Sequence, residues 1–410
     1  MTTMDAPVGE RERLDYLDIL RGLAVLAIFV VNIKAMLAPF PYYMNATLWP
    51  GEFDMTVAAV QAFLVEDKWR TIFTALFGAG LALIAERSAA RGAGSLGLLS
   101  RRLFFLLVFG LFHLVCIWGG DILFAYAASG FLAMWFRRAS AKTLMRWSIG
   151  CLAIAMVWNT AFSIAPAAIP EVRAEIEPIL WGSDPVALQT EFEKMLGGVG
   201  DQLNARLSSA KEYILMYFLA GGFWLTTLGV MLAGMWGYRT GFLIGRASSR
   251  TYVLAAIGGL GTAAVLDAIR WTVINQYDWD FAAFSYAQIL NQLDGFAGAI
   301  GYAGLVGWLV RSGWTPKAVT ATGRMAFTNY IACSLIGTTI ANGHGFGLFG
   351  SLTNLQLMLI VFAVWAAILI WSPLWLARFR FGPLEWLWRS LTYGKLQTFR
   401  KQAAVASAAL

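Results

Sequence analysis

FGLFHLVCIWGGDILFAY, residues 109–126, is the stretch around which the rest of the sequence is organised. It is almost wholly apolar, yet it contains Asp121 and His113, one of only two histidines in 410 residues. The glycine pair at 119–120 can close a tight turn between them. Apolar residues continue on both sides, so the pattern predicts a transmembrane helical hairpin with a histidine and a carboxylate near its closed end. Because an ionisable group is costly inside a membrane segment, both side chains are functional candidates.

The composition is typical of a membrane protein. Hydrophobic residues make up 59% of the chain and charged residues 13%, against about 25% charged in soluble domains. The apolar residues occur in runs of about 17 to 25, the length that crosses a bilayer as a helix. Such runs argue against the alternating strands of a membrane barrel. We therefore predict an all-α fold, a polytopic bundle of about ten transmembrane helices.

Neither the charge nor the cysteines indicate another class of protein. The net charge of +7 comes from basic residues between the apolar runs, with no nucleic-acid-binding motif, so we expect no nucleic-acid partner. Cys116, Cys151 and Cys333 fall inside apolar runs without metal-binding spacing. We expect neither a disulfide nor a metal.

Ten segments are expected to span the membrane. They are residues 15–36, 57–85, 102–118, 121–136, 146–165, 213–237, 251–271, 283–310, 325–342 and 354–376. The second is composite, with an amphipathic part before Lys68 and a spanning part after it.

A cytoplasmic N-terminus satisfies the positive-inside rule. Every segment then expected inside is basic, beginning with Arg11 and Arg13, whereas the long outside loop is rich in Asp and Glu. Both termini are then cytoplasmic, and the glycine turn of the hairpin faces outward. The chain divides into a five-helix half at 1–165, an extracytoplasmic loop with one or two short amphipathic helices at 166–212, and a five-helix half with an amphipathic tail at 213–410.

The first predicted helix carries three polar candidates. Asp18 and Arg21 are three residues apart and share a helix face. They form either a local ion pair that eases entry into the interface or an anion site, because the guanidinium fork suits phosphate. Asn32 lies about 16 Å further outward and either bonds a neighbouring helix or helps orient a substrate.

Lys68 and Arg70 precede the spanning part of the second segment, at its outer end in this topology. Basic residues on the outer side oppose the usual bias. They are either interfacial side chains that snorkel to water, or they bind an anionic group or pair with a carboxylate such as Asp121.

The hairpin residues also allow two interpretations. His113 should lie about 9 Å below the outer turn, and Asp121 can cap the returning helix. Because their depths differ, we expect two groups that line one outer cavity rather than a bonded pair. His113 is either a structural histidine or a general base, since its pKa near neutrality suits proton removal from a hydroxyl or amine.

Further candidates lie in the C-terminal half. In GRMAFTNY, residues 323–330, Arg324 is expected at a helix start, where the helix dipole disfavours a cation, so an anionic partner is expected. Asn329 faces the bundle or a neighbouring helix. Pro383 should open a short interfacial amphipathic helix within residues 378–395, where Glu385 either caps that helix or pairs with Arg324 or Arg21.

Several segments together resemble the YeiB-like family of bacterial membrane proteins, whose characteristic domain is one of unknown function. They are LDILRGLAVLAIFVVNI, WRTIFTALFGAGLALI, FGLFHLVCIWGGDILFAYA, GRMAFTNY and FGPLEWLWRSLTY. That family is grouped with the transmembrane acyltransferase superfamily, and the likeness of helix one to it rests on Asp18, Arg21, Gly22 and Asn32. The resemblance implies a multi-pass protein of the bacterial inner membrane that moves acyl groups from cytoplasmic acyl-CoA to a lipid or glycan acceptor on the far side.

The leading hypothesis is therefore an acyltransferase. Arg21 and Arg324 would lie near the phosphates of acyl-CoA. Helix one and residues 39–50 contain no histidine, so His113 would supply the base, with Asp121 or Asn32 orienting it. The alternatives are a non-enzymatic transporter or lipid-binding protein for an anionic molecule, and a structural membrane subunit in which His113 is merely packed. A homo-oligomer is left open.

Overall fold

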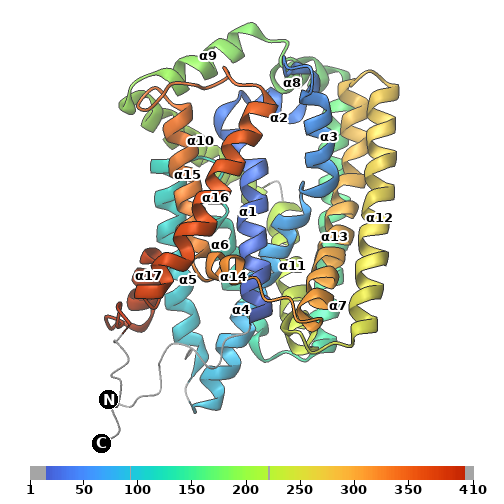
Figure 1. Cartoon of the computed structure of the whole chain (residues 1–410). Coiled ribbons are helices and arrows are strands. Elements are labelled where there is room, and N and C mark those ends of the chain that lie inside the picture. The colour runs from blue at the N-terminus through green and yellow to red at the C-terminus, as the bar shows by residue number, and fades with distance from the viewer. Residues whose placement is uncertain (1–14, 93, 220–221, 402–410) are drawn as a thin grey trace, which may run out of the picture.

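The computed structural model describes residues 15–92, 94–219 and 222–401. Arg11 and Arg13, which contribute to the topology prediction, lie outside these residues. All regular structure in the described part is helical, apart from one isolated bridge between Phe379 and Arg400. Figure 1 shows a bundle of long helices, with α8 and α9 at one end and α17 toward the other.

The long helices are α1 (Asp15–Leu37), α4 (Lys68–Ala90), α5 (Ser95–Phe112), α7 (Ala141–Ala168), α10 (Val199–Leu219), α11 (Gly222–Arg239), α12 (Ser249–Gln276), α13 (Phe281–Arg311) and α16 (Asn354–Arg378). The shorter ones are α2 (Phe40–Met44), α3 (Asp54–Leu64), α6 (Leu123–Ala133), α8 (Pro170–Trp181), α9 (Pro185–Leu196), α14 (Lys317–Arg324), α15 (Ala326–Ala341) and α17 (Pro383–Tyr393). A π-helix, His113–Ile117, extends α5, and 3-10 turns occupy Ala46–Leu48, Met134–Arg138 and Phe242–Ile244.

The lengths of these helices fit a polytopic membrane bundle. In the described residues, seven spans are long and apolar enough to cross a bilayer: Asp15–Leu37, Asp54–Ala90, Ser95–Ile117, Ala141–Ala168, Ser249–Gln276, Phe281–Arg311 and Asn354–Arg378. An eighth arises if Val199–Phe218 and Gly222–Arg239 are counted together. The other two predicted segments correspond to α6, of 11 residues, and α15, of 16 residues. A count of ten therefore stays a prediction.

α1 is the central helix of the bundle (Figure 1). It contacts α4, α13, α14, α15 and α16, and most of its side chains are buried. A helix that is apolar on all sides is stable only when it is surrounded by other helices. The sequence of α1, with its uninterrupted run from Leu23 to Val31, meets that condition.

α1 and α14 approach each other backbone to backbone. A methyl group at Gly22 would lie 2.2 Å from the carbonyl oxygen of Val319, and one at Gly323 would lie 1.8 Å from that of Asp18. Only glycine fits both places, because such distances are far inside van der Waals contact. Arg21 is next to Gly22 in the sequence and Arg324 is next to Gly323, so this contact places the two arginines side by side.

The span Asp54–Ala90 is broken between α3 and α4. Asp67, the residue before α4, has a positive φ of 54°, which is uncommon for a residue with a side chain. Its carboxylate accepts hydrogen bonds from Arg70 and from Asn291 of α13. These hydrogen bonds fix the position of the helix break next to α13.

We expect Gly323→Ala to lower the midpoint of thermal unfolding in detergent, because overpacking of this kind costs about 1–3 kcal/mol. Gly258→Ala is the matched control, since Gly258 lies in helix α12 with nothing within 4 Å of an added methyl group. That change should leave the midpoint unchanged or raise it. Equal midpoints for the two variants would contradict the close contact between α1 and α14.

Candidate functional site

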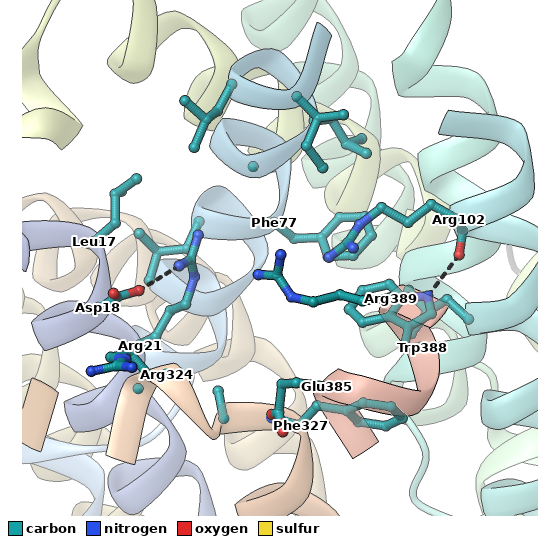
Figure 2. A pocket seen from close by; sticks show the side chains of 18 of the residues that line it. Leu17, Asp18, Arg21, Phe77, Arg102, Arg324, Phe327, Glu385, Trp388 and Arg389 are labelled. Atoms are coloured by element: carbon teal, nitrogen blue, oxygen red, sulfur yellow. Dashed lines mark hydrogen bonds and ion pairs between the residues drawn. The ribbon is translucent and has the colours of Figure 1, made fainter. Parts of the chain in front are cut away.

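A cavity of about 240 Å³ lies between α1, α4, α5, α6, α15 and α17. Figure 2 shows arginine side chains that come toward it from several helices. Its charged lining is Asp18, Arg21, Arg87, Arg102, Arg324, Arg380, Glu385 and Arg389. Its apolar and aromatic wall includes Phe73, Leu76, Phe77, Leu106, Leu123, Tyr126, Phe327 and Tyr330. The cavity therefore joins a strongly cationic region to an apolar one.

Arg21 and Arg324 enter the cavity from two helices in contact. Arg21 donates a hydrogen bond to Asp18 one turn earlier, at 2.8 Å. Figure 2 shows Arg324 beside this pair. The prediction that Arg324 begins a helix was wrong. Arg324 is the last residue of α14, and the next helix, α15, begins only after Met325. At a helix C-terminus the dipole favours a cation, so this position is suited to an arginine.

Glu385 connects α17 to α15. Its Oε1 accepts hydrogen bonds from the backbone N–H groups of Phe327 and Thr328 at 2.7 and 3.0 Å, and its Oε2 accepts one from the Thr328 hydroxyl at 2.5 Å. Pro383 opens α17, as predicted. Glu385 was expected either to cap its own helix or to pair with Arg324 or Arg21. It caps α15, because the first turn of α15 has free N–H groups that face it.

Aromatic rings support two of the other arginines. The guanidinium of Arg102 lies 3.5 Å from the ring centre of Trp388, whose Nε1 donates to the Arg102 carbonyl oxygen at 2.9 Å. Arg389 lies 4.8 Å from the ring centre of Phe381. A cation over an aromatic face is attracted by the electrons of the ring, so these contacts help to hold both arginines in place.

His113 and Asp121 form a bonded, fully buried pair. His113 Nδ1 lies 2.8 Å from Asp121 Oδ1, and neither side chain is exposed. Asp121 Oδ2 accepts a hydrogen bond from the backbone N–H of Phe124, in the first turn of α6. The expectation of two separate groups was therefore wrong.

The reason lies in the backbone of the hairpin. The depth estimate assumed that α5 continues as an α-helix to the turn, whereas it widens into the π-helix and residues 118–122 are not helical. Gly110 also lets α5 approach α6 closely, since a methyl group there would lie 2.3 Å from the backbone nitrogen of Phe124. Both effects bring Asp121 to the level of His113.

One tyrosine separates His113 from the cavity. The ring centres of His113 and Tyr330 are 5.2 Å apart, and Tyr330 lines the cavity. His113 Nε2 is buried, and within the described residues it has no hydrogen-bond partner. With Nδ1 facing a carboxylate, Nε2 is the nitrogen left to act on another molecule.

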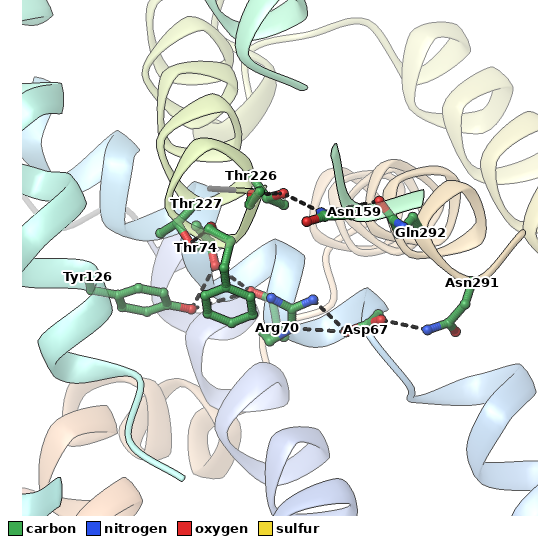
Figure 3. A network of polar contacts seen from close by, with 11 residues as sticks. Asp67, Arg70, Thr74, Tyr126, Asn159, Thr226, Thr227, Asn291 and Gln292 are labelled. Atoms are coloured by element: carbon green, nitrogen blue, oxygen red, sulfur yellow. Dashed lines mark hydrogen bonds and ion pairs between the residues drawn. The ribbon is translucent and has the colours of Figure 1, made fainter. Parts of the chain in front are cut away.

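Lys68 and Arg70 both pair with carboxylates, which was one of the predicted alternatives, although in the described residues neither pairs with Asp121. Lys68 is buried and contacts Asp294 and Asp267, not Asp121. Arg70 pairs with Asp67 at 2.6 Å, and its carbonyl oxygen accepts from Thr74 (Figure 3).

The two predicted asparagines also lie outside the cavity. Asn329 is buried and fully bonded: its Nδ2 donates to the Thr322 carbonyl and to Ser372, and its Oδ1 accepts from Trp371. Asn32 is half-buried in α1 and does not line the cavity. Of the predicted site residues, Asp18, Arg21, Arg324 and Glu385 come together, with the histidine pair behind Tyr330.

Known proteins match almost the whole chain. The family described as "Protein of unknown function (DUF418)" matches residues 237–395. The uncharacterized protein YeiB of Escherichia coli (strain K12) is 31% identical over 399 residues, which cover 93% of this chain and 96% of YeiB. The chain belongs to this YeiB-like family. The uncharacterized protein YxaH of Bacillus subtilis (strain 168) is 28% identical, over 97% of this chain and 99% of YxaH. No solved structure matches significantly.

The family match covers only part of the site. Arg324 and Glu385 lie within the matched residues, whereas Arg21 and His113 precede them. The cavity therefore lies at the contact between the N-terminal helices and the part of the chain that the family description covers.

Sequence reasoning missed several cavity residues. Arg87, Arg102, Arg380 and Arg389 were interpreted as topology signals, and Arg389 also as part of the interfacial amphipathic helix, since each follows or precedes an apolar run. Tyr330 was not singled out at all. The available signal was the repetition of arginine at helix ends that are predicted to be cytoplasmic, which is also what the positive-inside rule produces.

We expect Glu385→Ala to lower the free energy of unfolding by about 3 kcal/mol, because hydrogen bonds to a charged group contribute about 1.5–3 kcal/mol and the α15 N–H groups lose their acceptor. Glu52→Ala, at an exposed position, is the control and should change it by less than about 0.5 kcal/mol. Chemical denaturation in detergent micelles measures both. If the two variants unfold alike, Glu385 does not hold α15 and α17 together.

Proposed function

We propose that this protein is an acyltransferase of the bacterial inner membrane, which moves an acyl group from cytoplasmic acyl-CoA to a hydroxyl or amine on the extracytoplasmic side. The observation that carries the proposal is the cavity, where arginines from α1, α4, α5, α14 and α17 surround one end of an apolar space next to a histidine–aspartate pair. The acceptor is a lipid or a glycan in this proposal.

The proposed topology has ten membrane segments, α6 and α15 included, and both termini in the cytoplasm. Under the positive-inside rule the arginine end of the cavity then faces the cytoplasm, and α8 and α9 lie outside. The five-helix halves at 1–165 and 213–410 would meet along α1 and α14. Acyl-CoA would reach the arginines from the side on which cells contain it.

The charge of the lining suits such a ligand. Six arginines face Asp18 and Glu385, which leaves an excess of positive charge in the described lining. Acyl-CoA carries a diphosphate and a phosphomonoester, about four negative charges in all. The cavity is smaller than the usual 300–1,000 Å³ of a complete ligand site, so it would hold the thioester end, with the phosphates at the arginine mouth.

The chemistry would start at His113. Asp121 accepts the Nδ1–H hydrogen bond, which fixes the tautomer and leaves the Nε2 lone pair free. Nε2 would take the proton of the acceptor as its oxygen or nitrogen attacks the thioester carbonyl carbon. The C–S bond then breaks, and His113 returns the proton to the departing thiolate. Because Tyr330 lies between the imidazole and the cavity, its ring must rotate to admit the acceptor.

A lipid-binding or transport function is the second candidate. It is favoured by one observation, that His113 itself does not line the cavity. In that case the arginines would bind an anionic head group and the apolar wall its chain, and no bond would be made or broken.

We expect the double substitution Arg21→Gln and Arg324→Gln to weaken acyl-CoA binding at least tenfold, because each lost charged contact to phosphate is worth about 1.5–3 kcal/mol. Fluorescence anisotropy of a labelled acyl-CoA on protein in nanodiscs measures this. Arg250→Gln, an exposed arginine outside the cavity lining, is the control and should bind like wild type. Equal affinity in all three proteins would refute the proposed ligand site.

We also expect His113→Gln to slow acyl transfer by about 10²–10⁴-fold while acyl-CoA still binds, since a general base contributes about that factor. Release of free CoA in proteoliposomes given acetyl- or palmitoyl-CoA and a panel of hydroxyl and amine acceptors is the measurement. His344→Gln removes the other histidine, whose Nδ1 lies 2.6 Å from Gln202 Oε1 in the loop region, and should leave the rate unchanged. Binding by wild-type protein without any transfer would support the lipid-binding alternative instead.

A further inference from the structure

The break between α3 and α4 carries four charged residues in the run EDKWR, residues 66–70. Their partners come from other helices as well as from the run itself. Glu66 pairs with Arg270 of α12 at 3.0 Å. Asp67 pairs with Arg70 at 2.6 Å, and Asn291 of α13 donates to its other oxygen at 2.8 Å (Figure 3). In these two pairs each carboxylate faces one cation.

Lys68 is different, because one ammonium faces two aspartates. Its Nζ lies 2.9 Å from Asp294 Oδ2 and 3.0 Å from Asp267 Oδ2, and it donates a further bond to the Ala62 carbonyl oxygen. The side chains of Lys68 and both aspartates are at most 1% exposed. Asp294 Oδ1 has no hydrogen-bond partner in the described part of the chain.

The surrounding groups leave this excess in place. Arg270 lies 3.6 Å from Asp267 Oδ1 but is closer to Glu66. Lys34 of α1 interacts electrostatically with Glu66 and Arg270 and lies over the ring of Tyr43, and in the described residues it forms no ion pair with either aspartate.

Tyr302 of α13 also faces Asp267, but its hydroxyl donates to the Leu64 carbonyl oxygen. Glu66, Asp267 and Asp294 are therefore three carboxylates within ion-pair distance of two cations, Lys68 and Arg270, which leaves one carboxylate in excess.

An uncompensated carboxylate costs several kcal/mol in a water-free interior, and a bound proton removes that cost. We infer that Asp267 and Asp294 share one proton next to Lys68, so that the broken helix, α12 and α13 together form a proton-binding site inside the membrane domain. A proton fits better than a metal cation, because the Lys68 ammonium already occupies the space between the carboxylates and would repel one.

The site is separate from the arginine cavity. None of Lys68, Asp267 and Asp294 lines that cavity, although α4 begins at the proton site and its later turns line the cavity. The inference stands whether or not the protein is an acyltransferase, because it rests on the charges around Lys68 alone.

Infrared spectroscopy of the full-length protein in nanodiscs tests the inference directly. At neutral pH, wild type should show the carbonyl-stretch band of a protonated carboxyl group that Asp267→Asn and Asp294→Asn each lack, because one remaining carboxylate pairs with Lys68 as an ion. A band that persists in either variant, or no difference between the spectra, overturns the shared proton.

Thermal unfolding across pH gives the second readout. Wild type should lose stability as the pH rises and the proton leaves, since two carboxylates then face one ammonium, whereas each single Asn variant should not. The double variant Asp267→Asn/Asp294→Asn should unfold several degrees below either single variant, because Lys68 loses its last anion. Single variants as unstable as the double variant would contradict the proposal, as would a wild-type pH profile identical to theirs.

Discussion

The rest of this structure depends on one constraint: a charge buried in an apolar helical bundle must be compensated where it lies, because no water is there to do it. The protein meets this constraint in different ways. Glu66 and Asp67 each face an arginine, Glu385 accepts from the free N–H groups of a helix start, and two arginines of the cavity lie on aromatic rings. The cavity, whose described lining has more arginines than carboxylates, is where an outside anion can contribute.

The backbone contact between α1 and α14 gives these charges their geometry. Gly22 and Gly323 have no side chains, so the two helices touch at the level of their neighbouring arginines. Two residues more than 300 positions apart in sequence thereby become one cationic surface. α17 then closes the opposite side, because Glu385 binds the start of α15 and Trp388 packs under Arg102.

Part of this arrangement was predictable from the sequence. Apolar runs of bilayer length are a sufficient signal for a helical membrane protein, and a histidine and an aspartate inside such runs are conspicuous. The bond between His113 and Asp121 was missed because its prediction required the backbone to leave the α-helical path. Arg324 was misjudged because no proline marks the end of α14 at Met325, and Gly323 lies inside the last turn of α14, where it contacts α1. Pairing of Lys68 with a carboxylate was one predicted alternative, but the partners were not identified, because Asp267 and Asp294 are about 200 residues away in sequence and charge pairing at that distance leaves no local pattern.

The site around Lys68 and the cavity around Arg21 and Arg324 differ in charge and in enclosure, and these differences indicate different ligands. Around Lys68 the ammonium and both aspartates are buried, so only a ligand as small as a proton can enter without rearrangement of three helices. Around Arg21 and Arg324 the excess charge is positive and the space opens beside an apolar wall, so the ligand must be an anion with an apolar part. Both sites use α4, the first at its opening turn and the second along its later turns. A shift of this one helix along its axis would change both at once. The broken junction at Asp67, held by side-chain hydrogen bonds rather than by a continuous helix, is where such a shift would cost least.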